Sequence, residues 1–286
     1  MKFIILTSLA LIAFAANSVL CRMALGNDTI DAAGFTIIRL LSGALVLLLI
    51  LQITHNKKSS SAKGNWLGGL MLFLYAITFS YAYITLDTGT GALILFGSVQ
   101  ISMLLISIVR GNRLHISEWV GVFIAFSGLV YLVMPGVTAP SLTGFVLMTT
   151  AGIAWGIYTL NGRGSTSPLH DTAYNFLRTL PFVAVVTILT LTRIRFTYEG
   201  LLLAVLSGAV ASGVGYTIWY SALRGLSATQ AAVVQLSVPV IAAIGGVIFM
   251  AETITLRLLL AALLILGGIL LVVLGRYYFI QHRSST

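Results

Sequence analysis

The stretch VQLSVPVIAAIGGVIFMAE, from Val234 to Glu252, carries one proline in an apolar run and ends on a lone glutamate. In a soluble protein it would be a buried helix broken in two, and in a membrane it would be a kinked spanning helix. The 286 residues are 58% hydrophobic and 8% charged, with mean hydropathy +1.04, whereas an average soluble domain carries about 25% charged residues. Because so few polar side chains cannot cover a soluble surface, we predict a multi-pass membrane protein.

The apolar runs are long and continuous rather than alternating, which favours helices over a β-barrel. Windows of about 20 apolar residues are long enough to cross a bilayer. The ten windows are 3–22, 33–53, 66–86, 89–109, 117–134, 141–161, 172–192, 200–223, 229–250 and 256–277. We therefore predict an all-α membrane protein of ten transmembrane helices, with brief connections that hide no soluble domain.

An internal repeat relates the two halves of the chain. Ile12-Ala13-Phe14 matches Ile153-Ala154-Trp155 at an offset of 141, and an offset of 139 then relates Tyr81 to Tyr220 and continues over more than 50 positions. The two predicted copies are residues 1–136 and 137–286. Because each copy has five spans, an odd number, the second copy enters the membrane upside down. Inverted five-helix repeats of this kind are a transporter device, since the halves can exchange conformations.

The N-terminus has an alternative interpretation. Lys2, an apolar run and Ala13-Phe14-Ala15 resemble a cleavable signal peptide. The repeat argues for a retained span, because residues 3–22 correspond to 141–161, which lie in the middle of the chain and cannot be a signal peptide.

The net charge of +9 could suggest nucleic-acid binding, but its only dense cluster, Lys57, Lys58 and Lys63, falls between two spans. Positive residues beside spans usually report orientation, with the excess on the cytoplasmic side. With the N-terminus inside, 11 of the 16 Lys and Arg residues are inner (Lys2, Lys57, Lys58, Lys63, Arg110, Arg113, Arg163, Arg178, Arg224, Arg276, Arg283) and 5 are outer (Arg22, Arg39, Arg193, Arg195, Arg257). We predict both termini in the cytoplasm, an inner-membrane location and no nucleic-acid partner. The 193–199 loop favours the opposite orientation, because it is predicted to lie outside and carries two arginines, Arg193 and Arg195.

The two halves carry local motifs beyond the repeat. The first span holds Phe14-Ala-Ala-Asn17-Ser18, the second Phe35-Thr-Ile-Ile-Arg39, and the ninth Ser237-Val-Pro239-Val240 followed by Ala251-Glu252. With the ten-span, 5+5 architecture, these stretches resemble the drug/metabolite transporter superfamily, specifically its EamA-type members. The first copy departs from the pattern, with Gln100 for the proline, Arg113 for the glutamate and Phe14 for an early tryptophan. The resemblance implies export or exchange of amino acids, sugars, nucleotide-sugars or other metabolites.

The spans contain the materials of a small-molecule site, which usually combines aromatic side chains with a few polar groups. The cavity candidates are Asn17, Tyr75, Phe79, Gln100, Trp155, Tyr158, Tyr216, Gln235 and Pro239. Pro239 lacks an N–H, which leaves the Gln235 carbonyl without its helical partner, and Gln100 lies at the equivalent depth of the other copy. The alternatives are a structural kink at Pro239 and ordinary interhelical hydrogen bonds for the polar residues.

Other residues near the span ends have more ordinary interpretations. Tyr81, Tyr83, Trp219 and Tyr220 fit the aromatic anchors found at membrane interfaces, and the small residues of 207–215 fit close helix packing. All seven acids lie in loops or at span ends, so no intramembrane carboxylate for proton coupling is evident, and we expect facilitated or exchange transport. Glu252 is the candidate for gating or coupling, with a solvated end charge as the alternative.

Two other classes of function compete with a transporter. An intramembrane enzyme is the least favoured, because the spans contain no Gly-x-Ser-Gly serine and the chain contains no His-Glu-x-x-His. A channel or structural membrane protein is the second choice after a transporter, because the sequence lacks the rings of charged residues that an ion channel would need. The lone Cys21 leaves no disulfide framework or zinc site, so no metal or cofactor is predicted. The expected partners are a small-molecule substrate and the lipid bilayer, with the protein a monomer or weak homodimer.

Overall fold

The computed structural model describes residues 2–54, 64–111, 115–136, 139–162, 165–192, 194–223, 225–226 and 228–283. The helices are α1 (Lys2–Gly26), α2 (Ala32–Thr54), α3 (Trp66–Ala82), α4 (Thr88–Val109), α5 (Ile116–Val133), α6 (Leu142–Asn161), α7 (Pro168–Thr190), α8 (Tyr198–Val205), η1 (Leu206–Val214), α9 (Gly215–Leu223), α10 (Ala228–Gln235), α11 (Ser237–Met250) and α12 (Leu256–Arg283). Across this described part of the chain the structure is helical, apart from one isolated bridge between Ile30 and Phe196. The prediction of an all-α fold is confirmed.

The described helices account for all ten predicted spans. Nine are long and apolar enough to cross a membrane, and α3 is a shorter apolar helix of 17 residues. The eighth span combines α8, η1 and α9, and the ninth falls on α10 and α11. The helix ends differ from the predicted windows by a few residues, because local residues at each end, and not only hydropathy, decide where a helix begins and ends. For example, α7 begins at Pro168, four residues before the predicted 172, since proline is tolerated in a first helical turn.

Polar side chains fix several helix starts. Asn65 accepts a hydrogen bond from the Gly68 N–H at the start of α3, and Ser141 does the same for Gly144 at the start of α6. At α5 the N-cap is His115, whose backbone N–H donates to Glu118 in a capping box. These caps satisfy N–H groups that have no partner within the helix.

Two spans are interrupted. The eighth contains η1, a nine-residue π-helix, which is unusual because π-helices are mostly single turns, often at functional sites. The ninth breaks at Leu236, and α11 then begins at Ser237 with Pro239 in its first turn. The break fits the proline, which cannot donate to the carbonyl of Gln235 and is best accommodated near a helix start.

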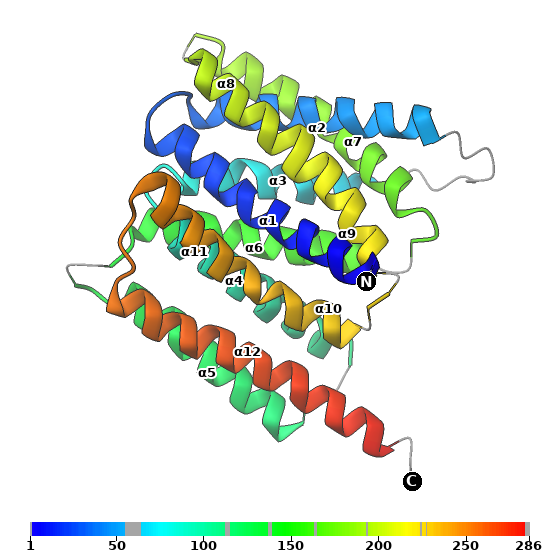
Figure 1. The fold of residues 1–286 in the computed structure, drawn as a ribbon, viewed down its shortest axis with the longest axis vertical. Helices are drawn as coiled ribbons and strands as arrows, with labels where there is room; N and C mark the ends of the chain where they lie inside the picture. Colours follow the sequence, from blue (N-terminus) through cyan, green and yellow to red (C-terminus); the bar gives the residue numbers. More distant parts are fainter. Residues whose placement is uncertain are drawn as a thin grey trace.

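The helices pack side by side, with connections at two opposite ends (Figure 1). One end carries both termini, and we call it the N-terminal side; the other carries the α1–α2, α3–α4, α5–α6, α7–α8 and α11–α12 connections, and we call it the far side. The pair α5 and α12 forms one edge of the bundle, and α2 and α7 pack together toward the opposite edge. Between the edges, α1, α3, α4, α6, α9 and α11 surround the centre of the molecule.

Glycines permit close backbone approaches between these helices. At Gly208 in η1, an added Cβ would collide with the carbonyl oxygen of Arg39 in α2. At Gly121 in α5, an added Cβ would lie 2.5 Å from the carbonyl oxygen of Gly268 in α12. The close packing predicted for the small residues of 207–215 is therefore confirmed, whereas the π-helix that they form was not predicted.

Candidate functional site

A cavity of about 530 Å³ lies between the helices on the N-terminal side. We call it the main cavity. Its lining comprises Phe14, Val99, Gln100, Met103, Trp155, Thr159, Gly162, Ser165, Thr166, Pro168, Tyr216, Trp219, Tyr220, Leu223, Leu226, Ala231, Ala232 and Gln235. Because the lining includes the α6–α7 and α9–α10 connections, the cavity reaches the N-terminal side of the bundle. Its size fits a small organic molecule.

Three aromatic residues close the deep end of the main cavity. Phe14, Trp155 and Tyr216 line it and also line a second cavity of about 20 Å³, which we call the inner cavity. The ring centroids of Trp155 and Tyr216 are 5.1 Å apart, and those of Phe14 and Tyr216 are 5.9 Å apart. These spacings are those of favourable aromatic pairs. The three rings therefore form a packed aromatic layer between the two cavities.

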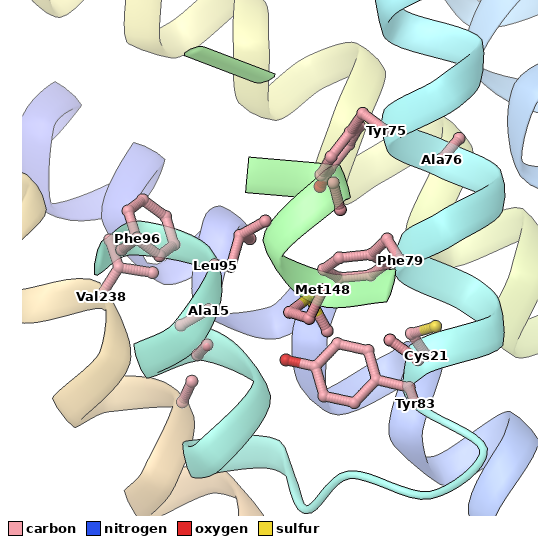
Figure 2. Packing of buried hydrophobic residues seen from close by; sticks show 14 of the residues in the cluster. Ala15, Cys21, Tyr75, Ala76, Phe79, Tyr83, Leu95, Phe96, Met148 and Val238 are labelled. Atoms are coloured by element: carbon pink, nitrogen blue, oxygen red, sulfur yellow. The ribbon is translucent and has the colours of Figure 1, made fainter. Parts of the chain in front are cut away.

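The inner cavity lies beyond this layer, at the centre of the bundle. It is lined by Phe14, Asn17, Ser18, Tyr75, Phe79, Leu95, Phe96, Trp155 and Tyr216. Figure 2 shows Tyr75, Phe79 and Tyr83 in a row along α3, close to Leu95 of α4 and Met148 of α6. The space is large enough for about one water molecule.

A hydrogen-bonded cluster borders the inner cavity. Asn17 donates from Nδ2 to the Tyr75 hydroxyl over 3.2 Å and accepts from Ser207 Oγ over 2.5 Å. Arg39 Nη2 also donates to the Tyr75 hydroxyl, over 3.1 Å. The Arg39 Cζ lies 5.1 Å from the Tyr75 ring centroid and 4.9 Å from that of Phe79, within cation–π range. Side chains from α1, α2, α3 and η1 thus meet at one point.

The position of Arg39 corrects one expectation. The sequence counted it among the outer charges, but it lies within α2, and only 2% of it is exposed. Its side chain reaches inward to α3 rather than outward to solvent. The error arises because a hydropathy window places a helix in the membrane without saying which way a single side chain near its end points.

An ionic cluster lies on the far side. Glu252 accepts hydrogen bonds from the Thr88 backbone N–H over 2.9 and 2.8 Å and from Thr88 Oγ1 over 3.0 Å. Arg22 Nε lies 3.3 Å from Glu252 Oε1, and Arg22 Nη2 lies 3.5 Å from Asp87 Oδ1. Arg22 also donates to the carbonyl oxygen of Tyr83 over 3.1 Å. We call Arg22, Asp87 and Glu252 the far-side cluster.

The far-side cluster settles the environment of Glu252. Only 11% of its side chain is exposed, so it is not the solvated end charge considered as an alternative. Its carboxylate sits at the N-terminus of α4, where the helix dipole favours a negative charge. The cluster joins the end of α1, the start of α4 and the α11–α12 connection. Its contacts therefore hold together three elements that surround the centre of the bundle.

Most of the predicted site residues come together around the two cavities. Gln100 and Gln235 line the main cavity, Asn17, Tyr75 and Phe79 line the inner cavity, and Trp155 and Tyr216 line both. Tyr158 is buried outside both linings and stacks on Trp155, with ring centroids 5.3 Å apart. Pro239 is also buried outside both linings, four residues along the chain from Gln235. Glu252 lies apart from these residues, on the far side.

Sequence reasoning misjudged four aromatic residues. Trp219 and Tyr220 are not interface anchors, because both line the main cavity. Tyr83 is fully buried, and its hydroxyl donates to the Thr88 carbonyl over 3.3 Å. Phe14 was predicted only as part of a motif, yet it lines both cavities. Helical spacing would have indicated part of this, since residues three and four positions after Tyr216 share its face.

Several sequence predictions fall outside the described residues. These are the lysine cluster at 57–63 and Arg113 as the counterpart of Glu252.

The bundle thus combines ten apolar helices, an aromatic cavity on the N-terminal side and an ionic cluster on the far side. The EamA-like transporter family matches residues 1–134 and 142–274. The chain therefore belongs to the EamA-like transporter family, and it is a multi-pass membrane transporter.

The relatives agree with this assignment. An uncharacterised protein of Pseudomonas aeruginosa is 50% identical over 275 residues, covering 96% of each chain. The uncharacterised transporter YoaV of Bacillus subtilis is 24% identical over 86% of this chain and 89% of its own. An uncharacterised transporter of Archaeoglobus fulgidus is 28% identical over 63% of this chain and 66% of its own. A solved crystal structure matches with a TM-score of 0.62 and 17% identity over 93% of this chain and 96% of that one, which shows a shared fold.

Proposed function

We propose that the protein exports or exchanges a small metabolite, an amino acid or a related compound, by alternating access. The observation that carries this proposal is the contrast between the N-terminal side and the far side of the bundle. The main cavity reaches from the N-terminal side to the aromatic layer, and the far-side cluster joins the surrounding helices beyond it. Access from one side together with closure on the other is what a carrier requires between its two states.

The proposal includes an orientation. With both termini in the cytoplasm, as the Lys and Arg distribution favours, the main cavity faces the cytoplasm and the far-side cluster faces the periplasm. The structure then represents an inward-facing state of an inner-membrane exporter or exchanger. The substrate enters from the cytoplasm and contacts the aromatic layer first.

Helix pairing supports the inverted repeat on which alternating access rests. In the first half α3 packs against α6 and α7, and the corresponding eighth span packs against α1 and α2. Likewise α4 packs against α6, and α11 packs against α1. The pairs α2–α7, α4–α11 and α5–α12 join equivalent helices of the two halves. The largest of these packing interfaces thus either have a counterpart or join equivalents, as a two-fold relation requires.

The hydrogen bonds of two aspartates also support the inverted repeat. Asp31, after α1, accepts a hydrogen bond from the Arg195 backbone N–H over 2.8 Å on the far side. Asp171, at the start of α7, accepts one from the Gly64 backbone N–H over 2.8 Å on the N-terminal side. Each aspartate therefore ties its own half to the connection after the second helix of the other half. The two ties lie on opposite sides, as inverted copies would place them.

Transport can be tested in proteoliposomes with Trp155→Ala. We expect counterflow of an amino acid or related metabolite by the unmodified protein, and a half-saturation concentration raised about ten-fold in the variant, because aromatic contact area is lost. Trp119→Ala is the matched control, since Trp119 lies on α5 and is 50% exposed on the outside of the bundle. Counterflow of no metabolite class by the unmodified protein, or equal effects of the two substitutions, would contradict the proposal.

A further inference from the structure

We propose that Arg39 binds an anionic group of the transported substrate, so that the substrate class is organic acids, including amino acids recognised through their carboxylates. This inference rests on the proposed transport function and adds to it a named chemical group and its receptor. It arises from a buried charge that the packing of the bundle does not fully explain.

The charge of Arg39 is costly where it lies. A charged side chain within a spanning helix is costly to insert into the bilayer, so such residues usually mark a substrate path or an ion pair. Arg39 is 2% exposed, and the two ion pairs among the described residues both belong to Arg22. Its hydrogen-bond and cation–π partners are Tyr75 and Phe79, neither of which is a carboxylate. The buried cation therefore has no counter-ion in the described part of the chain.

The guanidinium is only partly satisfied by hydrogen bonds. Nη2 donates to the Tyr75 hydroxyl, whereas Nη1 is buried without a hydrogen-bond partner in the described structure. Two aromatic faces, those of Tyr75 and Phe79, stabilise the charge but accept no hydrogen bond at Nη1. A carboxylate is the ligand that best completes such a group, since it can accept two parallel N–H bonds from one guanidinium.

Arg39 is placed behind the inner cavity, within reach of a deeply bound ligand. Its two aromatic neighbours, Tyr75 and Phe79, both line that cavity. Tyr75, to which Arg39 donates a hydrogen bond, also contacts Trp155 of the aromatic layer, with ring centroids 4.9 Å apart. A ligand whose apolar body occupied the main cavity could extend its anionic end past the aromatic layer toward Arg39. This requires the aromatic layer to part, which is a side-chain movement.

The linings also indicate what the site does not select. Among the described residues, those that line the main and inner cavities include aromatic, aliphatic, hydroxyl and amide side chains but no acidic one. An ammonium group would therefore find no counter-charge there. We expect the carboxylate of a substrate to be required and an amino group to be dispensable.

The test measures binding to the purified full-length protein through its thermal stability, because a ligand that favours the folded state raises the apparent melting temperature. The probes are three matched sets built on alanine, leucine and phenylalanine, each as the amino acid, the corresponding 2-hydroxy acid and the amino-acid amide. We expect stabilisation by the amino acids and hydroxy acids of at least one set and none by its amide. Arg39→Gln should weaken that binding roughly 10- to 100-fold, the loss of a hydrogen-bonded charge contact.

Arg178→Gln is the matched control. Arg178 is the Arg39 counterpart in the second half at the offset of 139, but it is only half-buried and stacks on Trp66 at 5.8 Å. It should leave binding unchanged. If Arg39→Gln does not fold, Arg39→Lys provides the same test, because it keeps a charge but cannot make two parallel hydrogen bonds, and it should bind carboxylates about ten-fold more weakly.

The outcomes separate this inference from the proposed function. Equal binding of acids and amides, full binding by the folded Arg39 variants, or stabilisation by none of the probes would overturn the role of Arg39. If counterflow in proteoliposomes then shows transport of sugars or other neutral solutes, the proposed function stands without it. If no solute of any class moves, both fall.

Discussion

The two sides of the bundle contain different kinds of residue around its centre. On the N-terminal side the main cavity is lined by aromatic rings, small residues and the amides of Gln100 and Gln235. On the far side, Arg22, Asp87 and Glu252 bridge three elements through ion pairs and backbone hydrogen bonds. In the proposed mechanism, the main cavity contacts the substrate and the far-side cluster provides the closure, so the two tasks fall to different regions. A surface for an apolar ligand body needs area, whereas a closure that must open again needs a few directional contacts that break together.

This separation suggests how the two states could be balanced. Contacts such as those of Glu252 are short, partly buried and made to helix ends, so they act on the relative positions of α1, α4 and α11. A substrate can shift the balance only by binding one state better than the other. In the proposed mechanism it does so at the aromatic layer, and the far-side cluster responds through the helices.

Breaking the far-side cluster should have the largest effect. Glu252→Gln removes the negative charge that holds Arg22, and we expect labelling of the inner cavity from the far side to rise on the order of ten-fold, as expected for loss of a charged hydrogen bond. The reporter is Ser18→Cys, which lines the inner cavity, in a background with the buried Cys21 replaced by alanine. The measurement is the rate of reaction with a membrane-impermeant thiol reagent.

Glu199→Gln is the control for that experiment, because Glu199 is an exposed acid in the first turn of α8 on the same side. It should leave the labelling rate unchanged. If both substitutions raise the rate equally, or if neither does, the cluster is not the far-side closure.

An intermediate effect is expected at the junction of the two regions. Asn17→Ala removes the hydrogen bonds to Tyr75 and Ser207, which are buried, and should lower the free energy of unfolding by about 1–3 kcal/mol. Asn161→Ala removes an exposed bond to Asn65 and should cost about 0.5 kcal/mol or less. Thermal unfolding in detergent compares the two. A similar loss in both variants would mean that the Asn17 cluster adds no more than a surface contact.

The smallest effect on stability is expected at the ninth-span break. Pro239→Ala should change the free energy of unfolding by about 1 kcal/mol or less, because proline in a first helical turn is compatible with the helix. It should alter the transport rate more, since it allows α10 and α11 to join across Leu236. Parallel measurements of melting temperature and counterflow rate test this. A destabilised variant whose folded fraction transports normally would make the break purely structural.

The spans could be predicted from the sequence because hydropathy over about 20 residues is a local property. Part of the cavity lining could also be predicted, namely Gln100, Gln235, Trp155 and Tyr216, since polar and ring-bearing side chains within a span stand out, whereas Phe14, Trp219 and Tyr220 were missed. The partners of Glu252 could not, because Arg22 is 230 positions away and the contact depends on how the helices pack. The inward direction of Arg39 was missed for the same reason, as it depends on how α2 packs against α3.

The length of the π-helix η1 determines the direction in which the side chains of the following helix, α9, point. In an α-helix each residue advances the chain by about 100° around the axis, since there are about 3.6 residues per turn. Removing one residue from Leu206–Val214 would rotate α9 by about that angle. Tyr216, Trp219 and Tyr220 would then turn from the cavity toward a neighbouring helix or lipid. The length of this segment, as much as its composition, specifies which face of α9 a substrate meets.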